Sequence, residues 1–278
     1  MILRNGLWIL AFYVVLALCL VPATILLSEQ GTTPGLPLQA LMVVIATAVM
    51  LALRREHPRT LLGTAASWRR GVPIGLASAL AIWGGTALVL WASGALGWHW
   101  NDVALQALGD GLLDCLAVAV AEELLFRGFP FQRLVDGIGA WPAQLLMAGY
   151  FVLTHSTGLA AAGELQAMAT VNIFLASLLF GAAFLRTRSL AIPVSLHFAL
   201  NFVQGPVLGF GVSGHGTAGL FVPELADAPS WWTGGAFGLE ASLPGTLAIL
   251  AAFVAVIAWP RRKAIAAAAA PTGRPLAR

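Results

Sequence analysis

Two adjacent carboxylates, Glu122 and Glu123, lie in an otherwise apolar stretch and are followed by Arg127. An ionised side chain at the centre of a membrane helix costs at least ~2.5–3.5 kcal/mol, so such acids are expected to pair or to do chemistry. Glu123 and Arg127 have the i, i+4 spacing, acid first, that favours an ion pair on one helix face. Glu122 projects about 100° away, so we expect that one partner cannot serve both acids. A carboxylate left without a local cation suits a general base. The alternative is that both acids simply pair with arginines at the helix end.

Three further polar side chains, His155, His197 and Asn201, lie in later apolar segments. The midpoint between Glu122 and His155 falls in the turn sequence 136–139, so antiparallel helices joined there place the two residues at the same depth. His197 and Asn201 are i, i+4 and share a helix face, about 10 Å from the preceding inner loop. We therefore expect one Glu, two His and one Asn to lie at one level. For the His/Asn pair, the alternative is an interhelical hydrogen bond that only stabilises the bundle.

Two hydrolytic reactions fit this set of side chains. A carboxylate and a His can activate water while His and Asn donate to a developing oxyanion, which gives peptide hydrolysis without a metal. Alternatively, Glu122, His155 and His197 bind zinc, whose bound water attacks. Zinc is thus the one cofactor that the residues suggest. We prefer the metal-independent reaction because the amide of Asn201 suits an oxyanion donor better than a zinc ligand, but both remain open.

The elements that must position these residues are those of a membrane protein. The chain is 59% hydrophobic and only 10% charged, against about 25% charged in a typical soluble domain. A spanning helix needs ~20 mostly apolar residues. The sequence predicts an all-α polytopic membrane helix bundle of about eight transmembrane helices, at Leu7–Leu27, Pro37–Leu53, Val72–Ala95, Val103–Phe126, Trp141–Thr154, Ala169–Leu185, Leu190–Phe210 and Pro244–Trp259.

The basic residues predict how this bundle is oriented. Basic residues concentrate on the cytoplasmic side of membrane proteins. With eight spans, N-in and C-in, all 15 basic residues belong to inner segments and none to outer connections. The net charge of +3 therefore reflects topology and predicts no nucleic-acid partner. The inner loop 54–70 can still contact the anionic headgroups of the lipid bilayer.

The sequence divides into parts with different expected roles. Asp110 and Asp114 fall toward the outer end of the fourth span, where only a wet helix end is expected. Cys19 and Cys115 lie in apolar spans and predict no disulfide. The parts are N-terminal transmembrane helices 1–3 (1–103), a catalytic core (104–210), an outer loop (211–243), the last transmembrane helix (244–260) and a cytoplasmic tail expected to be disordered (261–278).

Three motifs in the core resemble those of a known family. Glu-Glu-x-x-x-Arg at 122–127, Phe-x-x-x-His at 151–155 and His-x-x-x-Asn at 197–201 match that family in order and spacing. It is the CAAX prenyl protease and bacteriocin-processing (CPBP) family of intramembrane peptidases, also called type II CAAX endopeptidases or Abi proteins. The resemblance covers about residues 104–204 and implies an all-α membrane core with its site opening toward the cytoplasm.

The resemblance also implies a role for each motif residue. Glu122 would activate water, and His155 would assist it or ligate a metal. His197 and Asn201 would stabilise the oxyanion, and the acid–arginine pair of the first motif would support them. The family is commonly described as metallopeptidases, which keeps the zinc alternative open.

The function expected from these residues is that of an intramembrane endopeptidase that hydrolyses peptide bonds of membrane-associated protein or peptide substrates. One alternative is a non-proteolytic membrane scaffold or bacteriocin-immunity protein, which the intact motifs disfavour. Another is a proton-coupled transporter with Glu122 as proton carrier, which the absence of repeats and broken helix pairs disfavours. High Ala and Arg with low Lys content suggests a bacterial inner membrane.

Overall fold

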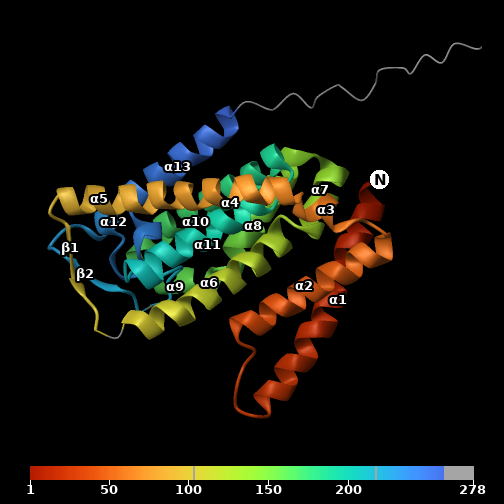
Figure 1. Cartoon of the computed structure of the whole chain (residues 1–278), viewed down its shortest axis with the longest axis horizontal. Coiled ribbons are helices and arrows are strands. Elements are labelled where there is room, and N and C mark those ends of the chain that lie inside the picture. Colours follow the sequence, from red (N-terminus) through yellow and green to blue (C-terminus); the bar gives the residue numbers. More distant parts are fainter. Residues whose placement is uncertain (103, 217, 260–278) are drawn as a thin grey trace, which may run out of the picture.

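Apolar helices make up most of this chain (Figure 1). The computed structural model describes residues 1–102, 104–216 and 218–259, so the tail 261–278, expected to be disordered, lies outside the described residues. The longer helices are α1 (Ile2–Ser28), α2 (Leu36–Arg54), α4 (Ala65–Ala79), α6 (Ala104–Phe126), α8 (Ala140–Thr154), α10 (Gln166–Thr187), α11 (Ala191–Phe202) and α13 (Leu243–Ala258).

Each of the eight expected spans has a helical counterpart in the structure. α4 continues through a π-helical turn (Leu80–Gly84) into α5 (Gly85–Ala92), and α11 continues into a second π-helical turn (Val203–Val207). By length and composition, four described segments are able to cross a membrane: Ile2–Ser28, Leu36–Arg54, Pro58–Ala92 and Gly163–Thr187. The chain is therefore a mostly helical membrane protein, while the count of eight spans and their orientation stay predictions.

The remaining helices are shorter or more polar than a simple span. α8 has 15 residues and α13 has 16, which is less than the ~20 residues needed to cross the hydrocarbon core. α8 ends at Thr154, as the sequence predicts, because His155 leaves the helical conformation with φ −96° and ψ 8°. Backbone that breaks at membrane depth is tolerated beside protein or a water-filled cavity. The end of α8 therefore marks a place where polar groups must be satisfied inside the bundle.

A short helix that the sequence analysis did not predict joins α6 to α8. The chain breaks at Gly128, where a Cβ would lie 2.2 Å from the carbonyl oxygen of Leu124. It then forms α7 (Phe129–Ile138) and turns at Gly139, whose φ of 90° favours glycine. The predicted turn is thus present, but a helix of ten residues precedes it.

A small antiparallel sheet departs from the all-α expectation. β1 (Leu96–Trp100) pairs with β2 (Phe221–Leu225), which lies in the segment expected to be a loop. Nδ1 of His99 lies 2.8 Å from Oε1 of Glu224 on the exposed face of this sheet. The same segment, 211–243, which forms the outer connection, also contains α12 (Ser230–Thr233) and 3-10 turns at Gly235–Phe237 and Leu239–Ala241. The described residues of the segment 211–243 are therefore an ordered part of the fold.

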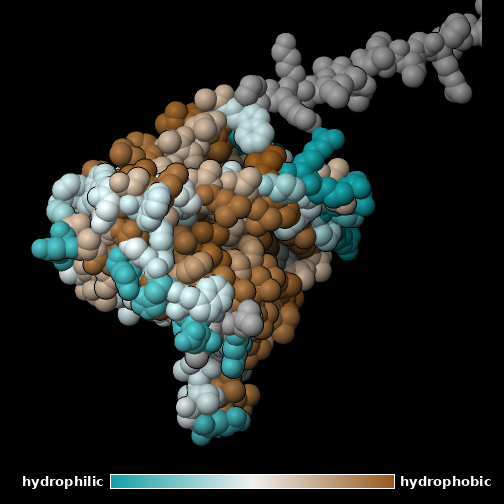
Figure 2. Space-filling model, turned by 60° about the vertical axis from the view of Figure 1, so that its left-hand side comes forward, coloured by the Kyte–Doolittle hydropathy of each residue, from teal (hydrophilic) through white to brown (hydrophobic). Residues whose placement is uncertain are grey.

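The centre of the bundle is α11, which packs against α4, α6 and α10. Nine of the 12 residues of α11 are buried, as expected for a mostly apolar helix at the centre of a bundle. α1 buries only Asn5, Phe12 and Leu16, and the tip of the α1–α2 hairpin stands away from the other helices (Figure 1). Apolar side chains cover a broad band of the surface between hydrophilic edges, as a lipid-facing surface requires (Figure 2).

The connections gather at two opposite ends of the bundle. The arginine end comprises the connections at 55–64, 127–139 and 188–190, together with short helix α3 (Pro58–Leu62). The outer end comprises the connections at 29–35, 93–102, 155–165 and 208–242, including short helix α9 (Ser156–Ala161).

Candidate active site

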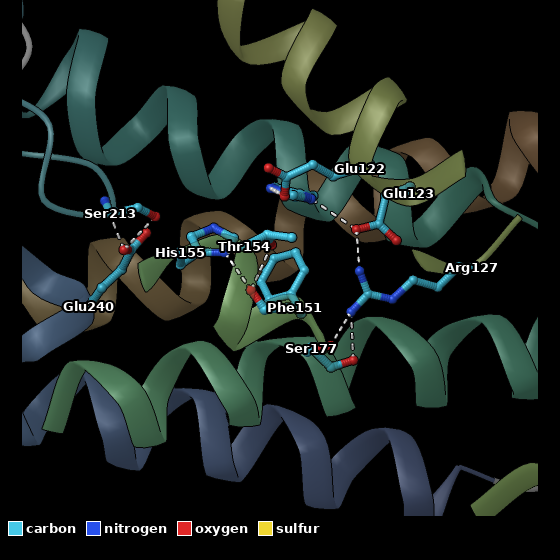
Figure 3. A network of polar contacts seen from close by, with 10 residues as sticks. Glu122, Glu123, Arg127, Phe151, Thr154, His155, Ser177, Ser213 and Glu240 are labelled. Carbon is cyan, nitrogen blue, oxygen red and sulfur yellow. Dashed lines mark hydrogen bonds and ion pairs between the residues drawn. The ribbon is translucent and has the colours of Figure 1, made fainter. Parts of the chain in front are cut away.

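The predicted ion pair of the first motif forms at the buried end of α6. Nη1 of Arg127 donates to Oε1 of Glu123 over 3.0 Å, and the two side chains are 1% and 0% exposed. Nη2 of Arg127 donates to the backbone oxygen and the hydroxyl of Ser177 on α10, at 2.8 and 2.7 Å (Figure 3). The guanidinium also lies 5.1 Å from the ring centres of Phe151 and Phe180. The pair is thus confirmed, and Ser177 is a partner that the sequence analysis missed.

His197 faces both carboxylates of the first motif. Its Nδ1 donates to Oε1 of Glu123 over 2.8 Å, and its Nε2 lies 3.7 Å from Oε2 of Glu122. The expectation that one partner cannot serve both acids was wrong, because an imidazole carries nitrogens on two edges of its ring. Stacking on Phe180, with ring centres 4.9 Å apart, fixes the ring plane. The contact with Glu123 therefore directs Nε2 toward Glu122.

Glu122 is the more accessible of the two acids, with a side chain 24% exposed. Its Oε2 has no hydrogen-bond partner among the described atoms, and the His197 nitrogen nearest to it is beyond hydrogen-bond range. Within the described part of the chain, Glu122 forms an ion pair with His197 and with no arginine. Oε2 is itself a buried atom, so it is the exposed part of this carboxylate that a water molecule or a substrate can reach.

His155 terminates α8 and is oriented by that helix. Its Nδ1 donates to the carbonyl oxygen of Phe151 over 2.7 Å, and the two rings lie 4.4 Å apart (Figure 3). The hydroxyl of Thr154 donates to the same carbonyl over 2.8 Å. Because Nδ1 is used in this way, Nε2 is the nitrogen that His155 has left for chemistry.

One cavity of about 790 Å³ is lined by Glu122, His155, His197 and Asn201. The structure thus brings together the four side chains that the sequence places at one level, and they come from α6, the end of α8 and α11. Glu123 and Arg127 do not line this cavity and lie behind it. A space of this size suits a segment of peptide rather than a single ion.

Glu240 is an acid of this region that the sequence analysis left in the outer loop without a role. It accepts hydrogen bonds from the backbone nitrogen and the hydroxyl of Ser213, at 2.9 and 3.0 Å (Figure 3). Burial raises the pKa of Glu240, while His155 and the bonds from Ser213 act in the opposite direction. A second chamber, of about 40 Å³, is lined by Glu240, Ser213, His155, His197 and Asn201 among others. The sequence signal for Glu240 is an acid between two apolar residues, Leu239 and Ala241. The structure shows that both of these neighbours are fully buried.

The zinc alternative can be tested on the donor set itself. Glu122, His155 and His197 would be the ligands, yet within the described ranges no three His, Cys, Asp or Glu side chains are grouped closely enough to hold a metal ion. Both histidines use Nδ1 in hydrogen bonds to protein oxygens. The side chains as arranged do not form a zinc site.

The comparisons with known proteins support the resemblance drawn from the motifs. Residues 104–203 match the model of the family described as type II CAAX prenyl endopeptidase Rce1-like. No curated protein and no solved structure matches the chain. The family is one of membrane proteases, so the match supports a peptidase in general. The segment includes all three motifs, whereas Glu240 and the outer connection lie beyond it.

Proposed function

We propose that this chain is an intramembrane endopeptidase that hydrolyses peptide bonds of membrane-associated proteins or peptides. The observation that carries the proposal is the shared cavity, in which a carboxylate with no arginine or lysine partner among the described residues faces two histidines and an asparagine. The match of residues 104–203 to a protease family supports it independently.

In this proposal Glu122 is the general base. Its carboxylate, which lines the cavity, accepts a proton from a water molecule while the water oxygen bonds to the carbonyl carbon of the substrate. His155 holds the same water through Nε2, since its Nδ1 is engaged by Phe151. The products of this step are a tetrahedral intermediate with a negative oxygen and a protonated Glu122.

Asn201 and His197 stabilise that negative oxygen. The amide nitrogen of Asn201 donates to it directly, and Nε2 of His197 donates when it carries a proton. His197 is held by Glu123, which is held in turn by Arg127. A carboxylate that orients the catalytic histidine has the same function in hydrolytic Ser-His-Asp triads. Such preorganised donors are worth about 10²–10³ in kcat each.

The reaction is completed when the peptide bond breaks. Protonated Glu122 returns its proton to the amide nitrogen of the substrate as the carbon–nitrogen bond cleaves. The products are a carboxylic acid, an amine and the regenerated carboxylate, so one water is consumed and no redox partner is needed. The side chains that contact water or substrate in these steps, Glu122, His155, His197 and Asn201, all line the cavity.

The proposal is tested by comparing the membrane peptidomes of cells that carry the wild type, Glu122→Ala or the control Glu29→Gln. Glu29 is an exposed acid at the outer end, distant in the chain from the site. We expect peptides that are present in the wild type and the control and absent with Glu122→Ala. Identical peptidomes for all three, with equal protein levels, would contradict proteolysis and favour a non-proteolytic scaffold.

A further inference from the structure

We infer that the small chamber behind the active-site cavity is a binding site for water, and that it supplies the water which hydrolysis consumes. This rear chamber has a volume of about 40 Å³. The binding of water stands on the geometry of the rear chamber alone. The supply of water to the reaction rests on the proposed function, so the two are measured separately.

The rear chamber adjoins the active-site cavity. Ser213 and Glu240 lie beside His155, on the side away from Arg127 (Figure 3). The two spaces have four lining residues in common, which are His155, His197, Asn201 and Ser213. Three of these carry the side chains proposed to hold the attacking water and to stabilise the oxyanion. A molecule in the rear chamber is therefore next to the reaction centre without occupying the space that a peptide would fill.

The rear chamber has the size of a water site and is too small for a segment of peptide. A water molecule needs ~10–15 Å³ of such space, so the chamber accommodates roughly three. Apolar side chains of α10, α11 and α13 form much of its wall, among them Ile173, Leu200 and Ile249. Buried water also needs ~2–4 polar partners. The polar groups of the wall therefore decide whether water binds there.

Two buried polar atoms of this wall lack a partner within the described protein. Nε1 of Trp83 can only donate a hydrogen bond, and Oδ1 of Asn172 can only accept one. Both side chains are 1% exposed, and neither atom has a hydrogen-bond partner among the described residues. Buried polar atoms are nearly always hydrogen-bonded, either to protein or to ordered water. Water satisfies both at once, because it accepts from Trp83 and donates to Asn172.

Glu240 supplies a third polar group. Its Oε2 accepts both hydrogen bonds from Ser213, so Oε1 is the oxygen that the carboxylate has left for water. Nδ2 of Asn172 donates to the backbone oxygen of Glu240 over 2.7 Å, which fixes this part of the outer connection against α10. Together with Trp83 and Asn172, Glu240 brings the polar partners of the chamber to about three, the number typical of a buried water.

Unusual backbone conformations occur on both sides of the rear chamber. Ser213 has a φ of 50°, which is uncommon for a residue with a side chain, and its N–H donates to Glu240. A Cβ on Gly158 of α9 would collide with the carbonyl oxygen of Ser213, so α9 packs directly against this turn. Trp83 lies in the π-helical turn between α4 and α5. Both kinds of conformation are frequent at functional sites.

The position of the rear chamber gives it a role in the proposed reaction. A substrate that fills the active-site cavity displaces the water there, although each hydrolysis consumes one water. Water in the rear chamber is retained beside His155, where the substrate does not reach. In the reaction, this water passes to Nε2 of His155 and gives its proton to Glu122. Glu240 is thus a positioning residue, which acts through the water that it holds.

The water site is tested by NMR on the full-length protein in detergent with isotope-labelled tryptophan. The chain has ten tryptophans, and the indole signal that disappears in Trp83→Phe is that of Trp83. A water that stays beside this indole gives a cross-peak between the indole N–H and the water resonance, with opposite signs in NOESY and ROESY spectra. Chemical exchange of the indole proton with solvent gives the same sign in both spectra.

Two variants show whether this water is in the rear chamber. Ala176→Val fills part of the chamber, and Ala248→Val is its matched control. Both alanines are partly buried and pack against the same apolar cluster, but only Ala176 lines the rear chamber. If Ala176→Val does not fold, Ala176→Cys fills less of the space and takes its place.

We expect the cross-peak in the wild type and in Ala248→Val, and its loss in Ala176→Val. Absence of the cross-peak from the wild type would overturn the water site without any variant. A cross-peak that persists unchanged in Ala176→Val would place the water outside the rear chamber and would also overturn the inference.

The supply of water is tested by the kinetics of a peptide that the peptidome comparison identifies as cleaved. We expect Ala176→Val to lower kcat about tenfold or more with unchanged KM, because the water is used after the substrate binds. Ala248→Val should leave both constants unchanged. Unchanged kinetics in Ala176→Val despite loss of the cross-peak would overturn the supply of water. A higher KM with unchanged kcat would do the same and make the chamber a pocket for a substrate side chain.

Failure of the proposed function is distinguishable from failure of the water site. If the wild type cleaves no peptide, the proposed function fails, and the supply of water to the reaction fails with it. The cross-peak of Trp83 does not depend on cleavage, so it still decides whether the rear chamber binds water.

Discussion

Nδ1 of His197 donates a 2.8 Å hydrogen bond to Oε1 of Glu123. The same carboxylate oxygen accepts a hydrogen bond from Arg127 at 3.0 Å, so Glu123 connects the buried guanidinium to the imidazole. Arg127 is anchored on α10 by Ser177. The second acid of the motif thus holds an arginine and a histidine in place, while the first acid faces the cavity. The two adjacent glutamates have different surroundings and should respond differently to the same substitution.

Glu122→Gln and Glu123→Gln are expected to differ in kind. Glu122→Gln removes the proposed base from a partly exposed position and should abolish cleavage with a nearly unchanged melting temperature. Glu123→Gln leaves Arg127 buried without its partner, which costs about 3–5 kcal/mol. Melting in detergent and cleavage assays check both. Equal falls in melting temperature for the two variants would show that this division of roles is wrong.

Asn201→Ala should act on the reaction and not on the fold. The amide lines the cavity, and its loss as an oxyanion donor should reduce kcat by about 10²–10³ with little change in KM. Steady-state kinetics on a purified substrate peptide measures this split. If KM rose while kcat stayed the same, Asn201 would be a substrate-binding residue instead.

Glu240 is expected to make stability depend on pH. Its pKa is raised in the folded protein by burial, so the folded state binds the proton more tightly than the unfolded state. Stability should therefore fall as pH rises from the ordinary carboxyl pKa through the raised value. Glu240→Gln removes this titration and can still accept from Ser213. Melting temperatures of both proteins across pH 4–8 test the sign, and parallel curves would contradict it.

Removal of metal is expected to leave cleavage intact. The donor side chains at the cavity do not assemble into a three-ligand set, and Asn201 is not a typical zinc ligand. The measurement is elemental analysis of the purified protein together with activity after dialysis against a chelator. Stoichiometric zinc that is lost in parallel with activity, and restores it on return, would refute the metal-free mechanism.

The eight-span topology is expected to place Glu29, Asp102, Glu164 and Asp227 outside the cytoplasm. The reason is that every basic residue then belongs to an inner segment. Reporter fusions at these four positions measure the side directly. A cytoplasmic signal at any one of them would break the helix assignment.

Contacts between residues close in the sequence were predictable, and contacts between distant residues were not. The Glu123–Arg127 pair follows from helix spacing alone, and so does the common face of His197 and Asn201. Ser177 joins Arg127 across 50 positions without any periodic signal in its own segment. The prediction that Glu122 and His155 lie together assumed a single turn between two helices; both residues line one cavity, although the helix α7 intervenes.

The structure of the outer connection, residues 211–243, was not predicted from the sequence. β1 and β2 pair across more than 100 positions. Glu240 reaches the site because the residues that follow β2 form α12 and two 3-10 turns. Its composition, rich in Gly, Pro and Trp, is that of a loop. The conformation of the outer connection depends on its packing against α9 and the end of α8, which lie elsewhere in the chain.

At the end of α8, the side chain of His155 both caps the helix and faces the cavity. The last carbonyls of a helix lack partners within it, and here the carbonyl of Phe151 is satisfied by the ring of His155 and the hydroxyl of Thr154. The histidine that is proposed to hold the attacking water therefore also caps its own helix. Replacing it removes a reactive nitrogen and uncaps a helix inside the membrane at the same time. An inactive His155 variant thus reports on chemistry only when the helix end has been shown to remain closed.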